Sequence, residues 1–183
     1  MKKTVIFSIL LCSFFCAMFA ASQSQAVRKK LDTPKEIQGY PCAKGTAWFF
    51  ADGKLNRCEI SRPINIGDAK IPFGSIIALR PDSKLDFVQL SDDTQIAGVT
   101  CRGGSFQGPA GGSSTEFYLS GKLKQCYLAG NQEVQDVPCM GGGLIGDRRG
   151  HAVQFSEGGR LQSCKLTKDF RGWRRGELFQ PGE

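Results

Sequence analysis

The feature that most constrains this chain is a turn motif that recurs four times. The first copy is Asp52-Gly53-Lys54-Leu55, and the equivalent segments begin at residues 82, 120 and 158, so the spacings are 30, 38 and 38 residues. Asp-Gly between alternating apolar residues predicts a β-hairpin with a two-residue type I′ turn. The chain is therefore predicted to contain four repeated hairpin units.

The residues around each turn repeat as well. Because side chains alternate along a strand, a two-residue turn places Phe49, Cys58 and Ile60 on one face of the first hairpin, which we expect to be buried. The leucine after each turn is then expected on the other face, beside Phe50 in the first unit and Tyr118 in the third. Apolar residues recur four positions before the turn glycine position and seven after it: Phe49, Leu79, Phe117 and Phe155, then Ile60, Leu90, Leu128 and Leu166.

This pattern predicts an all-β fold. The chain has 23 glycines and 13 phenylalanines, which suit many turns and aromatic strand positions, and it has no long apolar stripe of helical period. We expect repeated antiparallel β-hairpins over residues 37–168 that form an elongated, twisted meander sheet. A sheet that curls or closes into a barrel is the alternative, because closure also removes unpaired strand edges.

The cysteines follow the repeat. Three of them lie five residues after the turn glycine, and three precede it by 11, 20 and 20 residues. In the second unit the corresponding residues are Pro72 and Val88, so both cysteines are missing together. A bridge within each unit predicts that joint loss and leaves no thiol unpaired. The predicted pairs are Cys42–Cys58, Cys101–Cys126 and Cys139–Cys164.

The N-terminal residues have the pattern of a secretory signal peptide. Lys2 and Lys3 precede an uncharged apolar run over residues 5–19, and small residues follow, which predicts cleavage after Ser22 or Ala26. A transmembrane anchor is the alternative, but the run is shorter than the roughly 20 residues that span a bilayer. We assign residues 1–26 to the signal peptide and 27–36 to a flexible leader. The six remaining cysteines then suit a disulfide framework in a periplasmic or secreted protein.

Charge restricts the partners. Cleavage removes two lysines and no acidic residue, which leaves 22 basic against 17 acidic residues, a net charge of +5. A mildly basic exported chain is expected to meet an unidentified protein or an anionic envelope polymer, with at most peripheral membrane contact and no nucleic acid.

The turn region resembles a known repeat. The first unit has Gly45, Ala47, Phe50, Gly53 and Leu55 at the spacing of the variant MORN repeat of bacterial proteins. The resemblance implies a meander of hairpins with scaffolding, protein-binding or lipid-contact roles, and no single activity. Paired cysteines are not part of that family's pattern. The third unit matches with Thr115, Tyr118, Gly121 and Leu123, whereas the fourth departs at Ser156 and the second at Arg80 and Ser83.

Two further segments are candidate binding regions. Glycine-rich insertions occupy residues 102–112 and 140–150 at the same place in units three and four, where either a binding loop or a loop without a ligand is expected. Residues 169–183 form a C-terminal tail in which Arg171, Trp173, Arg174 and Arg175 make a basic aromatic cluster. That cluster either binds an anionic surface or partner, or caps the last sheet edge with Trp173.

These observations favour a non-enzymatic binding or scaffolding module in or outside the cell envelope. An inhibitor of a secreted enzyme and a purely structural envelope protein are the alternatives. An enzyme with its site in the glycine-rich loops, near His151 and Asp147, is a further hypothesis, although no catalytic signature accompanies the single histidine. The cysteines lack the Cys-x-x-Cys spacing of zinc sites, so neither a metal nor a cofactor is expected.

Overall fold

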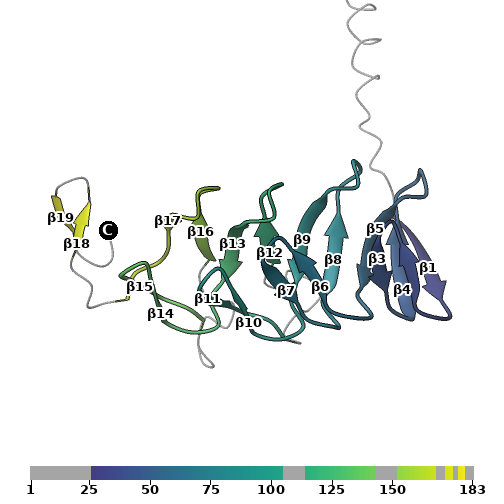
Figure 1. Cartoon of the computed structure of the whole chain (residues 1–183), viewed down its shortest axis with the longest axis horizontal. Coiled ribbons are helices and arrows are strands. Elements are labelled where there is room, and N and C mark those ends of the chain that lie inside the picture. The colour runs from purple at the N-terminus through teal and green to yellow at the C-terminus, as the bar shows by residue number, and fades with distance from the viewer. Residues whose placement is uncertain (1–25, 105–113, 143–151, 168–171, 175–176, 180–183) are drawn as a thin grey trace, which may run out of the picture.

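The computed structural model describes residues 26–104, 114–142, 152–167, 172–174 and 177–179, the last two ranges without their side chains. Within these residues all regular structure is β-strand. The strands form an elongated stack in which long and short hairpins alternate along the chain (Figure 1). We define a unit as one short hairpin followed by one long hairpin.

The long hairpins form the main sheet. It is antiparallel and nine-stranded, with the order β1-β4-β5-β8-β9-β12-β13-β16-β17. Neighbouring strands follow each other in sequence, and β1 and β17 end the sheet, so the predicted meander is confirmed and the sheet is open rather than closed into a barrel. The strands are β1 (Val27–Leu31), β4 (Gly45–Phe49), β5 (Leu55–Glu59), β8 (Ile76–Leu79), β9 (Leu85–Gln89), β12 (Ser114–Phe117), β13 (Leu123–Tyr127), β16 (Ala152–Phe155) and β17 (Leu161–Ser163).

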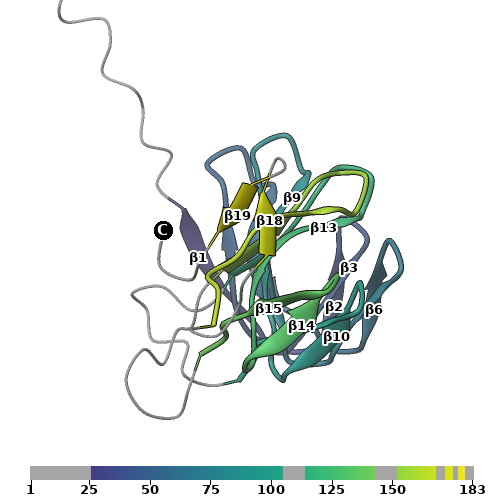
Figure 2. The same cartoon turned by 90° about the vertical axis from the view of Figure 1, so that its left-hand side faces the viewer.

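The short hairpins form a second layer that the sequence did not predict. Each is a separate two-stranded sheet, and together they form a row opposite the main sheet (Figure 2). In three units the last residue of the short hairpin also forms an isolated β-bridge with the residue that follows the long hairpin, as Cys42 does with Ile60. Their tips carry residues of positive φ, such as Gln38 (52°) with Gly39 (81°) and Ala97 (50°) with Gly98 (83°). The strands are β2 (Lys35–Ile37), β3 (Tyr40–Cys42), β6 (Ile64–Ile66), β7 (Ala69–Ile71), β10 (Thr94–Ile96), β11 (Val99–Cys101), β14 (Gln132–Val134) and β15 (Val137–Cys139).

Three disulfides connect the two layers. The bonds are Cys42–Cys58, Cys101–Cys126 and Cys139–Cys164, as predicted, each with 5.7 Å between Cα atoms. In each bond the first cysteine ends a short hairpin, and the second lies in or directly after the second strand of the long hairpin of the same unit. The bonds therefore hold a short hairpin against the main sheet, rather than joining the two strands of one hairpin.

In the second unit an apolar pair replaces the disulfide. Ile71 pairs with Ile64 as Cys42 pairs with Lys35, so Ile71 is the equivalent of the leading cysteine and the assignment to Pro72 is wrong. Val88 is the equivalent of the trailing cysteine, as predicted, and both Ile71 and Val88 are fully buried. Burial of two aliphatic side chains takes the place of the covalent link.

The interior lies between the layers. Phe49, Cys58 and Ile60 are buried there, as predicted, but Leu55 is buried with them rather than on the opposite face. The reason is the turn. Phe50 donates to the Lys54 carbonyl at 2.8 Å, and Phe49 pairs with Leu55 across a bulge, so the leucine returns to the inner face.

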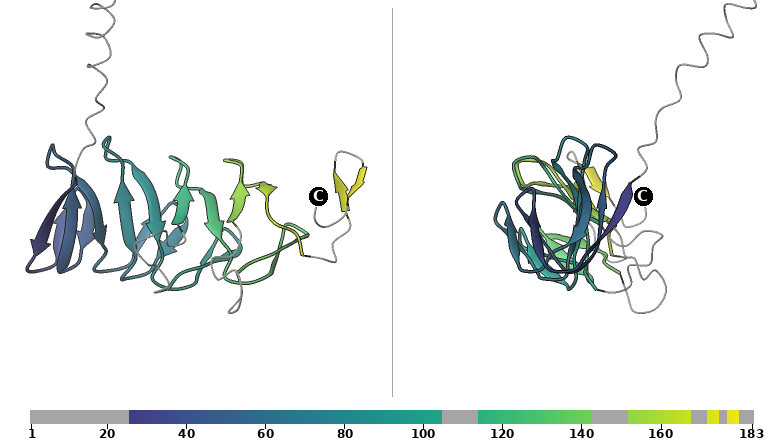
Figure 3. Two further views of the ribbon diagram at one scale, coloured as in Figure 1. Left: turned by 180° about the vertical axis from the view of Figure 1, so that it is seen from behind. Right: turned by 90° about the vertical axis from the view of Figure 1, so that its right-hand side faces the viewer.

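The turn itself also differs from the prediction. Within residues 50–54 only Gly53 has positive φ, at 84°, whereas a type I′ turn needs two such residues. Asp52 accepts a hydrogen bond from the Lys54 amide at 3.0 Å, and this bond lowers the pKa of the Asp52 carboxyl. Asp82 lies equivalently in the second unit. The four long turns line up along one edge of the stack (Figure 3).

Polar side chains at the short-hairpin tips join the layers near that edge. Gln38 accepts a hydrogen bond from the Leu55 amide at 2.7 Å, and Gln135 accepts one from the Leu161 amide at 2.9 Å. In the second unit the tip residue is Gly67, whose backbone packs against the backbone of Gly121 with no room for a Cβ atom. Each of these tips therefore contacts a long turn directly.

The two ends of the chain differ from one another. Residues 27–31 were expected to belong to a flexible leader, but they form β1, which pairs with β4 over five residues and places Lys29 4.9 Å from the Phe49 ring centre. Near the C-terminus, β18 (Gly172–Arg174) and β19 (Glu177–Phe179) pair with each other and not with the main sheet.

The apolar link in unit two predicts that a fourth disulfide can be added. We expect the double variant Ile71→Cys/Val88→Cys to form it, because these residues occupy the positions that three other units bridge. The bond closes a loop of similar length and should raise the free energy of unfolding by about 3 kcal/mol relative to the reduced double variant in the chain-entropy picture. Mass spectrometry of non-reduced peptides and urea unfolding measure both effects.

The single variant Val88→Cys is the control, and it should be less stable than the parent. Two free thiols in the double variant would contradict the equivalence of the four units.

Candidate functional site

A row of side chains crosses the outer face of the main sheet, the face turned away from the short hairpins. Its members pair directly with one another from β1 to β9, so each lies beside the next on one face. We call it the outer row. It consists of Arg28, Trp48, Arg57, Ala78 and Phe87.

Trp48 and Arg57 form the centre of the outer row. Trp48 pairs with Arg28 on one side and Arg57 on the other, and the Arg57 guanidinium lies 5.4 Å from the centre of the Trp48 ring. Both Trp48 and Arg57 are half-buried. A guanidinium over an indole ring is a cation–π contact that fixes the orientation of both groups.

The two arginines have hydrogen-bond capacity to spare. Arg57 donates to Gln89 Oε1 at 3.4 Å and Arg28 to Thr46 Oγ1 at 3.3 Å, both long bonds. Among the described residues neither arginine has a carboxylate partner, and the buried Nε of Arg57 has no acceptor. A half-buried guanidinium is usually paired with an anion, so this arrangement can bind one.

The side chains of the outer row shield the sheet beneath them. Ala78 is 6 % exposed and Gln89 is 9 % exposed, although both belong to a face that no other sheet of the described residues covers. Trp48, Arg57 and Phe87 therefore lie close over the sheet and present a preformed surface.

The other half of the outer face is polar. Gln154 donates to Gln125 Oε1 at 3.0 Å, and Ser163 donates to Gln154 Oε1 at 3.0 Å, so a hydrogen-bonded chain crosses β13, β16 and β17. Beside it, Lys124 and Glu116 form an ion pair at 2.9 Å, and that hydrogen bond raises the pKa of Lys124. These groups satisfy each other, in contrast to the arginines of the outer row.

The turn edge of the stack carries a second regular set of charges. The residue after the turn glycine position is cationic in all four units: Lys54, Lys84, Lys122 and Arg160. Lys54 forms an ion pair with Asp52 at 3.2 Å, and Lys84 forms one with Asp82 at 3.6 Å. The side chains of both ion pairs are about half exposed. Such exposed pairs contribute little. Asp52 and Asp82 offset the cations of the first two units, so the turn edge is a weaker candidate than the outer row.

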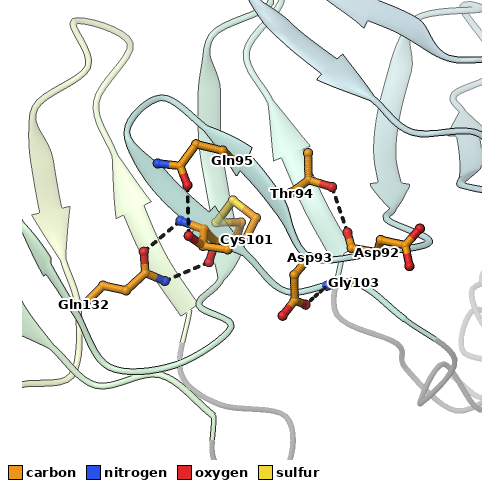
Figure 4. The surroundings of a disulfide bond; sticks show 9 residues. Asp92, Asp93, Thr94, Gln95, Cys101, Gly103 and Gln132 are labelled. Atoms are coloured by element: carbon orange, nitrogen blue, oxygen red, sulfur yellow. Dashed lines mark hydrogen bonds between the residues drawn. A yellow bond between two sulfur atoms is a disulfide. The ribbon is translucent and has the colours of Figure 1, made fainter.

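The glycine-rich loops start from fixed, equivalent positions. Gly103 donates to Asp93 Oδ1 at 2.8 Å, and Gly141 donates to Asn131 Oδ1 at 3.0 Å. Near the Cys101 disulfide, Gln132 accepts from the Thr100 amide at 2.7 Å and donates to its carbonyl at 2.8 Å (Figure 4). Residues 105–113 and 143–151, with Asp147 and His151, lie outside the described residues.

The binding cluster predicted at the C-terminus cannot be compared with the outer row. Trp173 and Arg174 belong to β18, whose side chains are outside the description, as are Arg171 and Arg175 entirely.

The sequence prediction did not find the outer row. Trp48 and Arg57 directly precede the buried Phe49 and Cys58, and Phe87 precedes Val88, so strand alternation already assigns all three to the outer face. The incorrect placement of the turn leucines on that face hid the signal.

Neither a metal site nor a membrane-spanning helix is found in the parts of the chain that the structure describes. No three His, Cys, Asp or Glu side chains gather there, and none of its segments is a long apolar helix. Comparison of the chain with protein-family models, curated proteins and solved structures finds no match.

The loop bases predict a sharp difference between two nearby glycines. A Cβ atom at Gly141 would overlap the carbonyl oxygen of Gly130, whereas one at Gly130 would meet no atom within 4 Å. We expect Gly141→Ala to lower the free energy of unfolding by about 1–3 kcal/mol, and Gly130→Ala to change it by less than about 0.5 kcal/mol. Urea unfolding of both variants tests this, and equal stabilities would contradict the close approach.

Because Arg57 has no carboxylate partner among the described residues, we expect that the protein can fold without it. We expect Arg57→Met to keep the free energy of unfolding within about 1 kcal/mol or to raise it, because an apolar side chain of similar length replaces a poorly paired guanidinium. Phe49→Ala, on the inner face, is the control and should cost about 3–5 kcal/mol. A loss above about 2 kcal/mol for Arg57→Met in urea unfolding would indicate a structural role instead.

Proposed function

We propose that this chain is an exported, non-enzymatic binding module whose outer row holds a ligand in the periplasm or outside the cell. The observation that carries the proposal is Arg57, a half-buried guanidinium on Trp48 without a carboxylate partner among the described residues. Uncovered aromatic and arginine side chains are typical of binding surfaces.

Two features support the proposed location in the periplasm or outside the cell. Three disulfides indicate an oxidising, extracytoplasmic environment. The basic and apolar N-terminal residues support export by a signal peptide that ends at Ser22 or Ala26. Cleavage after Ala26 would make Val27, the first residue of β1, the mature N-terminus.

The architecture supports a binding role through its rigidity. Covalent and apolar links hold the inner layer to the main sheet, so the outer residues are presented by paired strands rather than by loops. The resemblance of the turns to variant MORN repeats is consistent with this role and remains part of the proposal.

Affinity capture from the cell envelope tests the proposed function. Immobilised mature protein, residues 27–183 with oxidised cysteines, is expected to retain one envelope component in a reproducible ratio. The variant Trp48→Ala/Arg57→Gln should lose it, whereas Gln125→Ala/Gln154→Ala, on the polar half of the same face, should keep it. Equal recovery by all three proteins, or no recovery by any, would contradict the proposal.

A further inference from the structure

We propose that the outer row binds an acidic glycan, a polysaccharide whose sugar rings carry carboxylates. This inference rests on the proposed function and names the class of ligand that the outer row takes. It is supported by the arginines without a carboxylate partner, by the aromatic side chains beside them, and by the lack of free backbone groups at Trp48 and Arg57.

The arginines select for an anion. Among the described residues, Arg57 makes one side-chain hydrogen bond, at 3.4 Å to Gln89, although a guanidinium carries five N–H donors. Arg28, two strands away in the same row, also has no carboxylate partner within the described residues. Around Trp48 the cations Arg28, Lys30 and Arg57 face one acid, Glu59. A carboxylate can accept two parallel hydrogen bonds from a guanidinium, which is the strongest pairing available to it.

The sheet face disfavours an extended peptide. Peptides usually add to sheets at an edge, where free backbone N–H and C=O groups can pair with them. Trp48 and Arg57 lie inside the sheet, where β4 and β5 have neighbours on both sides and the ladder uses those groups. At Trp48 and Arg57 the outer row therefore offers side chains alone, and it suits a ligand recognised through rings, hydroxyls and charges.

The aromatic side chains suit sugar rings. Trp48 and Phe87 are both half-buried on the open face, three strands apart, which corresponds to about 14 Å. Aromatic rings pack on the apolar face of a sugar, and the Arg57 guanidinium lies on a strand between those of the two rings, where it can donate to a carboxylate or a hydroxyl. A ligand that contacts both rings must extend over several sugars, so we infer a polymer rather than a single sugar.

Binding measurements with defined polymers test the inference. Isothermal titration of the mature protein uses polygalacturonate, alginate and hyaluronate as acidic glycans, dextran as a neutral glycan, and poly-L-glutamate as an acidic chain without sugar rings. We expect saturable binding to at least one acidic glycan and weaker binding to dextran and poly-L-glutamate. Arg57→Gln should weaken that binding by at least about tenfold, the loss expected for one charge-assisted hydrogen bond, and Trp48→Ala should weaken it by about as much through loss of the aromatic contact. Gln125→Ala/Gln154→Ala should leave it unchanged.

Several results would overturn the inference. These are no saturable binding to any of the three acidic glycans, undiminished binding by Arg57→Gln, or equal binding of poly-L-glutamate, which would indicate general attraction to polyanions. If Trp48→Ala unfolds, Arg57→Gln alone decides the matter. An envelope component that the outer row captures and that protease destroys would refute the glycan while leaving the proposed function intact.

Discussion

The structure depends on the link between the last residue of each short hairpin and the second strand of the following long hairpin. A hairpin with three-residue strands is marginal alone, and each short hairpin here is a two-stranded sheet whose pairing with the long hairpin is limited to its last residues. Its place in the fold therefore comes from buried side chains, from the link, and from the few hydrogen bonds at its two ends. In three units the link is a disulfide, and in the second it is the buried pair Ile71 and Val88. The same pair of positions thus accepts either a disulfide or two aliphatic side chains, because both keep the short hairpin in contact with the main sheet.

Because the core and the links lie on the inner face of the main sheet, its outer face does not contribute to the contact between the layers. The inner faces of the long strands supply the core, and the disulfides add stability that so narrow a core lacks. Residues that alternate with the core, such as Trp48 and Arg57, lie outside the layer that the disulfides and the buried side chains stabilise. A half-buried arginine whose Nε has no acceptor has an energetic cost, and this is the observation on which the proposed binding role rests.

The sequence predicted the features that repeat in register and missed those that depend on backbone detail. The disulfide pairs could be predicted because both cysteines are missing together in unit two. The buried position that holds Phe49 in the first unit and Phe117 in the third could be predicted from strand alternation. The short hairpins were missed because tips such as Ala97-Gly98 are weak turn signals and three-residue strands are too short to show alternation. The inward position of Leu55 was missed because a bulge shifts the side chain to the other face without changing the apolar pattern. The outer row was hidden by that one error.

Peptide mapping of the oxidised, mature protein by mass spectrometry tests the central claim most directly. If each unit is held together by its own link between the layers, the cross-linked peptides join Cys42 to Cys58, Cys101 to Cys126 and Cys139 to Cys164. A peptide that joins Cys126 to Cys139, or Cys58 to Cys101, would show that the disulfides connect consecutive units instead. That result would contradict the two-layered unit and the rigid outer face that follows from it.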